Sequence, residues 1–466
     1  MTPSYAANRL VMRQIWKQDP QVLSVLRAAP LRPGRTYRWS QYALSFEEGG
    51  AGYLCSFLTR ECLACGLEPG DRRFAAEEIA GNKDLSYLAE NRFLVPEDAD
   101  EYKTYEGLLR ILRALDRPEG LTGCTILPTL KCNARCVYCY EAGREETSMS
   151  PDTADHTAAY ILQHARRSAP VRLHWFGGEP LLRPDIIDRI CQRLREEGLE
   201  YHSAMTSNGS LITEELADRL VRDWRLESIQ IALDGPEEEY IRRKAYPRYR
   251  DYYRAVPRSA AALAARGVRV TLRINTDRGN AASIPEFLRE LSDLIPDKTG
   301  VKIYFCVLNE ERARPEAREV WDRIFEADSL IERYGFLPDY NRRLHRFKTF
   351  NCMADNTGRS VLIAPDGLLY SCEMCLPGTS FGNVWEGVTD RALFDRLSRP
   401  EPAPDKCRSC PLLPECTPFT GCPVRDYDCF GLTKRHLIRS LKLSVRSISD
   451  ARDTAEDRPC GSPSDE

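Results

Sequence analysis

Three cysteines lie close together at Cys132, Cys136 and Cys139, in the spacing C-x3-C-x2-C. Thiolates are soft ligands that favour iron–sulfur clusters, and three of them at this spacing can hold one cubic cluster. The fourth iron then keeps an open position for another molecule. A zinc site is the alternative, but zinc normally takes four ligands, and no histidine or fourth cysteine follows nearby. The spacing therefore predicts a [4Fe–4S] cluster with one open iron.

The residues of this motif resemble those of the radical S-adenosylmethionine (SAM) enzymes. An aromatic residue, Tyr138, stands just before the third cysteine, as it does in that family. The resemblance implies that the open iron binds the amino and carboxylate groups of SAM. It also implies that an electron from the cluster cleaves SAM to a 5′-deoxyadenosyl radical, which abstracts a hydrogen atom from the substrate.

Alternating strand and helix patterns between about residues 121 and 310 are expected to position this motif. Such alternation predicts an α/β fold with a parallel sheet covered by helices. Six units resemble the partial (β/α)6 barrel of radical SAM enzymes, and barrel chemistry lies at the carboxyl ends of the strands. The cysteines directly follow the first strand. The expected strands are 123–130, 171–176, 202–207, 228–233, 268–275 and 301–308, with helices at 151–167, 184–197, 213–224 and 252–266.

Glycines and polar residues follow the second and third expected strands. Gly177, Gly178 and Glu179 stand after the second strand, where glycines let the backbone approach a ligand closely. They resemble the family's GGEP motif, which implies a contact with the SAM amino group. Ser207 and Asn208 end the third strand and resemble the family's TNG turn, which also implies cofactor binding.

Charged residues follow the fourth strand and lie on the fifth. Asp234 ends the fourth strand, and Lys244 stands where relatives place an arginine that binds the SAM carboxylate. Lysine would act there as a point charge without the bidentate fork of arginine. The neighbours Arg242 and Arg243 are the alternatives. Arg273 is expected to face the barrel interior, either as a contact to SAM or substrate or in a structural salt bridge.

A second group of cysteines lies nearer the carboxyl terminus and resembles the SPASM extension, which holds two auxiliary [4Fe–4S] clusters. The segment before Cys372 is expected to form two strands around a Pro-Asp-Gly turn. The resemblance implies ligands Cys352, Cys372 and Cys422 for the first cluster. Either Cys375 closes that cluster, or one iron is open and could bind a substrate thiolate. Two zinc sites are the alternative. The ligands implied for the second cluster are Cys407, Cys410, Cys416 and Cys429.

Glu373 directly follows one of these cysteines. In sulfatase-maturing relatives an aspartate beside that cysteine acts as a base. The resemblance therefore implies that Glu373 is a catalytic base. A structural glutamate is the alternative.

The first 115 residues precede the cluster motif. Aromatic and β-forming residues at 36–46 and 51–59, around Glu-Glu-Gly-Gly, predict a β-hairpin. Helical patterns follow at about 75–80, 83–91 and 101–117. This pattern resembles the winged-helix-like domain that binds the leader peptide of a precursor by adding it as a strand to a sheet edge. A structural cap on the barrel is the alternative.

Composition and charge limit the partners and the cellular location that we expect for this chain. The chain has 466 residues, a net charge of −3 and no long apolar run, so neither a nucleic-acid nor a membrane partner is expected. With no signal-peptide pattern, a cytoplasmic protein is expected. Reduced thiols are expected there, and the pair Cys62 and Cys65 is expected to bind no metal. The expected domains are 1–115 (recognition), 116–310 (barrel), 311–350 (connector), 351–446 (SPASM) and 447–466 (disordered tail).

These features predict an oxidoreductase-type radical SAM enzyme that modifies a ribosomally synthesised peptide. The expected bond is a thioether or another crosslink between side chains. The expected cofactors are three [4Fe–4S] clusters and SAM. The expected partners are the precursor peptide and an electron donor of the flavodoxin or ferredoxin type. The alternatives are a sulfatase-maturing enzyme that forms formylglycine and a non-catalytic iron–sulfur scaffold.

Overall fold

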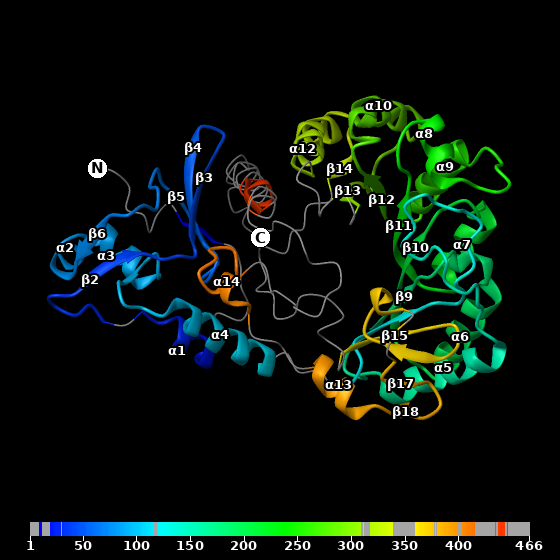
Figure 1. Ribbon diagram of the computed structural model, residues 1–466, viewed down its shortest axis with the longest axis horizontal. Helices are drawn as coiled ribbons and strands as arrows, with labels where there is room; N and C mark the ends of the chain where they lie inside the picture. The colour runs from blue at the N-terminus through cyan, green and yellow to red at the C-terminus, as the bar shows by residue number, and fades with distance from the viewer. Residues whose placement is uncertain are drawn as a thin grey trace, which may run out of the picture.

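The chain folds into two lobes, seen side by side in the computed structural model (Figure 1). One lobe contains the amino-terminal segment and the other contains the predicted barrel. No helix in the described part of the chain is long and apolar enough to cross a bilayer. The structure describes residues 9–11, 19–28, 30–115, 119–308, 311, 317–338, 359–376, 378, 380–398, 403–414, 434, 437–442 and 445.

The barrel lobe is built on a sheet whose centre is six parallel strands in chain order. Each of them matches a predicted strand, so the α/β alternation read from the sequence is confirmed. Their carboxyl ends share one edge, where the predicted site residues stand. The strands are β8 (Gly123–Ile126), β9 (Val171–Trp175), β10 (Tyr201–Ser207), β11 (Leu226–Ala232), β12 (Arg269–Thr276) and β13 (Val301–Val307).

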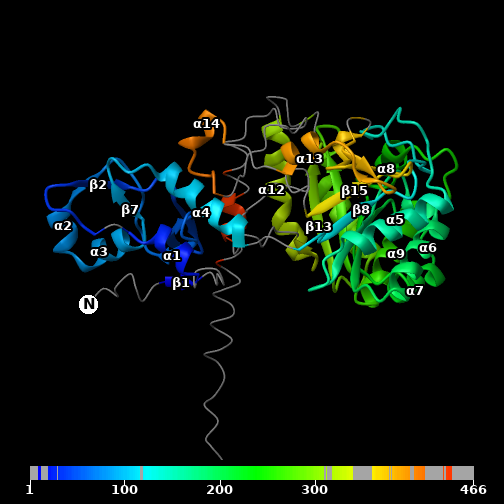
Figure 2. The same cartoon turned by 90° about the horizontal axis from the view of Figure 1, so that it is seen from below.

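Helices cover the outer face of this sheet (Figure 2). Local sequence starts them: Ser150 caps α5 by accepting a hydrogen bond from the Thr153 N–H, and Thr213 caps α7 through the Leu216 N–H. Each buries an apolar stripe against the strands. The helices are α5 (Pro151–His164), α6 (Pro184–Glu196), α7 (Glu214–Arg222), α8 (Glu237–Lys244), α9 (Tyr252–Ala265), α10 (Ile284–Leu294) and α12 (Ala317–Arg333), with short 3-10 turns η2 (Pro180–Leu182) and η3 (Ala281–Ser283).

The sheet continues past the barrel on both sides. The strand β14 (Leu337–Pro338) pairs with β13. On the other side β15 (Ser360–Ile363) runs parallel to β8, and β16 (Leu368–Tyr370) turns back antiparallel to it. The predicted pair of strands around the Pro-Asp-Gly turn is therefore confirmed. The segment goes on through η6 (Glu373–Cys375), β17 (Gly382–Asn383), β18 (Gly387–Val388) and α13 (Arg391–Ser398).

The amino-terminal lobe has two small antiparallel sheets, in the orders β1-β5-β4-β3 and β6-β2-β7. The predicted helices are present near their expected positions, and the winged-helix-like assignment stays a prediction. The elements are β1 (Arg9–Val11), α1 (Pro20–Leu26), β2 (Thr36–Trp39), β3 (Ala43–Glu48), β4 (Ala51–Ser56), β5 (Glu61–Ala64), β6 (Arg73–Ala75), α2 (Ala76–Ala80), α3 (Lys83–Glu90), β7 (Leu94–Pro96) and α4 (Glu101–Leu115).

The predicted hairpin is formed by β3 and β4. Its turn is Gly49-Gly50, whose φ values of 59° and 76° suit a tight hairpin. The first predicted strand, 36–46, is in fact divided between the two sheets. A turn separates its halves: Ser40 bonds through its N–H to the Phe93 carbonyl, and its own carbonyl accepts from the Ala43 N–H.

Two cysteines of this lobe are joined, contrary to the expectation of reduced thiols. Cys55 and Cys62 stand directly opposite each other on β4 and β5 and form a disulfide. Cys65 is buried and free. The strand register brings the two thiols together, and spacing along the sequence does not reveal that register.

Candidate active site

The loop after β8 carries Cys132, Cys136 and Cys139, and all three thiols are half-buried. The carbonyls of the last turn of α8 hold this loop. The Arg135 N–H donates to the Lys244 carbonyl at 2.9 Å, and the Val137 N–H donates to the Arg243 carbonyl at 3.0 Å. The last carbonyls of a helix lack partners within it, so these two hydrogen bonds satisfy carbonyls of α8 and N–H groups of the cluster loop.

The donor set of this loop fits an iron–sulfur cluster. Burial raises the pKa of Cys132 to about 12; the Ala134 N–H opposes the rise, and the charges of Glu179, Cys136 and Cys139 add to it. In the described residues no three histidine, cysteine or acidic donors meet closely enough to hold a single ion. Three thiolates suit a cubic cluster with one open iron, whereas zinc normally takes four ligands and no histidine or fourth cysteine adjoins these three in the sequence. Iron must displace the thiol protons, so loading should improve as the pH rises.

Gly177 and Gly178 pack against the backbone of the cluster loop. A Cβ on Gly177 would collide with the Thr129 carbonyl, and one on Gly178 would lie 2.6 Å from the Leu130 carbonyl and closer still to that of Lys131. The Gly178 N–H also donates to the Thr129 carbonyl at 3.1 Å. The glycines therefore allow two loops of the chain to touch, whereas the sequence suggested close approach to a ligand.

Replacing Gly178 by alanine should displace the cluster loop, because the added methyl group meets only backbone atoms that cannot rotate away. We expect the iron bound per chain after reconstitution to fall. SAM affinity, measured by calorimetry, should fall at least about tenfold, which corresponds to about 1.4 kcal/mol. Gly66→Ala is the matched control, because nothing lies within 4 Å of its added Cβ. Equal SAM affinity in the two variants would contradict this role for Gly178.

Glu179 ties the loop after β9 to the loop after β10. Its fully buried carboxylate accepts hydrogen bonds from Ser207 Oγ at 2.9 Å and from the Asn208 N–H at 2.8 Å. Burial raises the pKa of Glu179 to about 7, although these bonds and Lys244 oppose the rise. A raised carboxyl pKa means that the folded state binds the proton more tightly. The stability contribution of Glu179 therefore declines as the pH rises toward 7.

Asn208 connects the same corner to the cluster loop. Its Nδ2 donates to Asn133 Oδ1 at 2.7 Å and lies 3.9 Å from Cys132 Sγ. Asn133 Nδ2 in turn donates to Ser210 Oγ at 2.9 Å. The sequence interpretation did not select Asn133 or Ser210. The only sequence signal for these two residues is that Asn133 directly follows Cys132 and that Ser210 lies two positions after Asn208.

A buried polar network fills the space beside the cluster loop. Tyr138 Oη donates to Asp234 Oδ2 and accepts from Lys244 Nζ at 3.0 Å. Lys244 Nζ lies 3.2 Å from Asp234 Oδ2, and Asn275 Nδ2 donates to Asp234 Oδ1 at 2.9 Å. Burial alone would raise the pKa of Asp234, but Lys244, Tyr138 and the Asn275 N–H hold it below its usual value. Asp234 also raises the pKa of Lys244 well above its usual value, against the effect of burial. Both groups are therefore charged at neutral pH.

The neighbouring basic residues have different surroundings. Arg242 is exposed and paired with Glu239, whereas Arg243 is buried and lies 2.9 Å from Asp277 Oδ2. Arg273 on β12 is half-buried and donates to Asn275 Oδ1 at 2.8 Å and to Cys306 Sγ at 3.0 Å. Two of the three consecutive basic side chains contact Tyr138: Lys244 Nζ donates to its Oη, and the Arg243 guanidinium lies over its ring, 5.1 Å from the centroid.

The comparisons with known proteins agree with this geometry. The model of the Radical SAM superfamily matches residues 126–291, from β8 to α10. The chain carries a radical SAM domain. A PqqA peptide cyclase of Gluconobacter oxydans (strain 621H) is 26% identical over 299 residues, which cover 60% of this chain and 80% of that protein.

Two further proteins are also similar to this chain. An Fe-coproporphyrin III synthase of Methanosarcina barkeri (strain Fusaro / DSM 804) is 26% identical over 218 residues, covering 45% of this chain and 52% of that protein. A solved structure, native anSMEcpe with bound AdoMet and Cp18Cys peptide, has a TM-score of 0.53 at 15% identity, covering 71% of this chain and 99% of that chain. This likeness shows a shared fold.

Glu373 begins η6, which follows β15 and β16 and lies beside the cluster loop; β15 joins this segment to β8. Arg144 lies in the middle: it pairs with Glu141 at 3.0 Å and donates to the Glu373 carbonyl at 3.1 Å. The pKa of Glu141 is raised by burial and by the charge of Glu373, although Arg144 lowers it. Glu373 is half-buried beside the loop. Neither Glu141 nor Arg144 was selected from the sequence.

Four of the auxiliary cysteines lie in the described residues, on two different lobes. Cys372 and Cys375 flank Glu373 beside the radical SAM domain, with their Sγ atoms 3.7 Å apart. Cys407 and Cys410 lie at the short helix α14 (Asp405–Arg408), next to the amino-terminal lobe (Figures 1 and 2). The predicted tail (447–466) and two parts of the predicted connector (312–316 and 339–350) lie outside the described residues. So do the remaining predicted ligands, Cys352, Cys416, Cys422 and Cys429.

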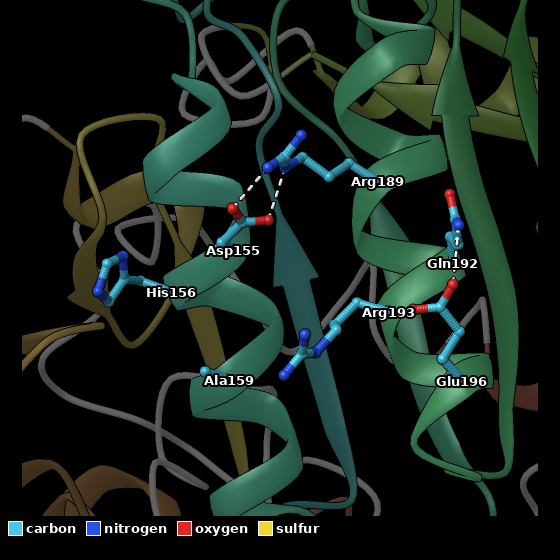
Figure 3. A pocket seen from close by; sticks show the side chains of 7 residues that line it. All are labelled: Asp155, His156, Ala159, Arg189, Gln192, Arg193 and Glu196. Atoms are coloured by element: carbon cyan, nitrogen blue, oxygen red, sulfur yellow. Dashed lines mark hydrogen bonds and ion pairs between the residues drawn. The ribbon is translucent and has the colours of Figure 1, made fainter.

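A surface hollow of about 490 Å³ lies between α5 and α6 (Figure 3). Charged side chains on the outward faces of these two helices line it. Asp155 and Arg189 pair across it at 2.6 Å, and Gln192 bonds to Glu196 at 2.8 Å. The charged side chains that line this hollow pair with one another, and the hollow is not part of the cluster site.

Proposed function

We propose that this chain is a radical SAM enzyme that modifies a ribosomally synthesised peptide by forming a thioether or another side-chain crosslink. One observation carries the proposal. The loop of Cys132, Cys136 and Cys139 meets the buried network of Tyr138 and Lys244 at the carboxyl ends of the barrel strands. Relatives that include a PqqA peptide cyclase support a peptide as the substrate.

The residues at this corner would hold the cofactors. Cys132, Cys136 and Cys139 would ligate the cluster, and Lys244 would face the SAM carboxylate. The other proposed SAM contacts are Tyr138, Gly177, Gly178, Glu179, Ser207, Asn208, Asp234 and Arg273. When bound, the cluster and SAM supply a radical that removes a hydrogen atom from the substrate, and an external flavodoxin or ferredoxin type of protein would supply the electron.

A crosslink removes two hydrogen atoms from the peptide. One leaves as a hydrogen atom, and the other as a proton and an electron. We propose that Glu373 accepts the proton, because its half-buried side chain lies beside the cluster loop. Auxiliary clusters at the cysteine pairs would provide the electron acceptor. Arg144 would position Glu373 through its bond to the Glu373 carbonyl.

The amino-terminal lobe offers a sheet edge for the peptide. β3 is the outermost strand of its sheet, and no described strand pairs with its outer side. Unpaired backbone groups at such an edge can accept an extended peptide as an additional strand. The opposite edge of this sheet is the three-residue strand β1, which pairs with β5.

The test uses two forms of the full chain in anaerobic lysate of the source cell. One is the wild type, and the other carries Cys132, Cys136 and Cys139 replaced by alanine. We expect the same small peptide, below about 10 kDa, to be captured by both. After addition of SAM and dithionite, only the wild type should lower the peptide mass by two hydrogen atoms. Each crosslink should accompany one 5′-deoxyadenosine.

Other outcomes would contradict the proposal. Capture of a folded sulfatase, with a cysteine or serine converted to formylglycine, would support the sulfatase-maturing alternative. A reconstituted wild type that releases no 5′-deoxyadenosine, even with its captured partner, would support the iron–sulfur scaffold. Deleting residues 1–115 is not a suitable control, because part of the carboxyl-terminal segment packs on that lobe.

A further inference from the structure

The amino-terminal lobe shares one hydrophobic core with the carboxyl-terminal segment that carries Cys407 and Cys410. The strands and helices of the barrel lobe have a separate core. Both views show α14 beside α4 and away from the barrel (Figures 1 and 2). The shared core joins Val22, Tyr42, Phe46, Phe57, Leu58, Tyr105, Leu108 and Leu112 of the lobe to Ala403, Leu412, Leu413, Leu437, Leu441 and Val445.

Three hydrogen bonds fasten residues 403–414 to the lobe at the start, middle and end of that segment. At its start, the Ala403 N–H donates to Tyr102 Oη at 3.2 Å. Next to Cys407, Gln41 Nε2 donates to the Arg408 carbonyl at 2.9 Å. At its end, an Arg60 guanidinium nitrogen donates to the Pro414 carbonyl at 3.0 Å.

The two cysteines lie between these attachments. The Cys410 N–H donates to the Cys407 carbonyl at 3.0 Å, so one turn holds both residues. Both are half-buried and pack against the shared core. An apolar wall of this kind controls solvent access to a metal site and supports its ligands.

Arg60 is an unusual residue for a surface turn. It has a φ of 59° between β4 and β5, and only 1% of its surface is exposed. Burial lowers the pKa of its guanidinium to about 9. A buried arginine is costly unless its hydrogen bonds repay the desolvation. Its bond to Pro414 reaches across more than 350 positions of sequence, two residues before Cys416.

We propose that the amino-terminal lobe forms the wall of an auxiliary iron–sulfur site at Cys407 and Cys410, with Arg60 as its positioning residue. The inference rests on the proposed auxiliary cluster and goes beyond peptide recognition. Iron retention at these cysteines and folding of the lobe are then linked. Because such linkage is reciprocal, each process stabilises the other by the same free energy.

The first test measures iron in full chains that also carry Cys132, Cys136 and Cys139 replaced by alanine, so that only auxiliary clusters remain. The parent should hold about eight irons per chain, and Arg60→Met should lose about four of them. Arg60→Lys keeps a donor and should retain more iron than Arg60→Met. Arg35→Met is the matched control: Arg35 is half-exposed and pairs with Asp98 on the same lobe. Equal iron in all these variants would overturn the proposal.

The reciprocal test leaves Arg60 unchanged and therefore does not depend on the folding of its variants. Chelating the iron should speed hydrogen exchange in β4 and α4 at least about tenfold, with α5 unaffected. A Cys407→Ser, Cys410→Ser chain should show no such change. If the hydrogen-exchange rates of β4 and α4 in the parent did not change when iron was removed, the proposal would be contradicted. Neither test uses SAM or a peptide, so failure of the peptide-modifying function would be seen separately.

Discussion

Replacing Cys132, Cys136 and Cys139 by alanine should lower the release of 5′-deoxyadenosine from SAM at least about a thousandfold, to the level without protein. The three thiols are the proposed ligands of the cluster, and the rest of the barrel cannot replace a redox centre. The fold should be nearly unaffected, because the three side chains are only half-buried. Chromatography of the quenched reaction measures the nucleoside, and the melting temperature measures the fold.

Cys191→Ala is the matched control for this experiment. Cys191 is fully buried in α6, so its loss should cost about 1 kcal/mol of unfolding free energy through the cavity it leaves. It touches no part of the proposed cluster site, and nucleoside release should therefore persist. If the triple variant still released nucleoside, the cluster would lie elsewhere in the chain.

Replacing Asp234 by asparagine should lower the free energy of unfolding by about 3–5 kcal/mol, because it leaves the buried Lys244 ammonium without its counter-charge. Lys244→Met should cost a similar amount by leaving the Asp234 carboxylate unpaired. The double variant removes both charges and should lose much less than the sum of the single losses. Denaturant unfolding of the four proteins gives the coupling energy, which we expect to exceed about 2 kcal/mol.

The same double-mutant cycle on Asp155 and Arg189 is the control, because both side chains are half-exposed. Its coupling should stay below about 1 kcal/mol. The pKa of Asp234 is depressed, so its contribution is present above the usual aspartate pKa and is lost as the pH falls through the folded value. The pKa of Lys244 is raised, so the coupling should be constant across neutral pH. Additivity for Asp234 and Lys244 at pH 7 would contradict the buried ion pair.

The barrel could be predicted from the sequence because its signals are local. Hydrophobic strands alternate with amphipathic helices, and caps such as Ser150 start the helices. Cys132 could be chosen from its cysteine spacing, and Glu179 and Asp234 from the resemblance of their motifs to those of the radical SAM enzymes. Each follows a strand, and parallel strands bring their carboxyl ends to one edge of the sheet. Local pattern therefore predicted the α/β fold, and the motifs indicated which edge of the sheet carries the proposed site.

Contacts between distant segments could not be predicted in this way. The role of Gly178 depends on the backbone of Lys131, and the bond of Arg60 to Pro414 joins opposite ends of the chain. No periodicity in either segment indicates its partner. The resemblance suggested a recognition domain at residues 1–115, and it gave no sign that this lobe shares its core with a cysteine-bearing segment.

The most direct test of the central claim is an electron paramagnetic resonance difference spectrum. The spectrum of dithionite-reduced wild type, minus that of the chain lacking Cys132, Cys136 and Cys139, isolates the cluster at the C-x3-C-x2-C loop. An iron with an open position binds SAM, so we predict that adding SAM changes this difference spectrum. A difference spectrum that SAM leaves unchanged would mean a closed cluster, and would contradict the proposed radical SAM enzyme.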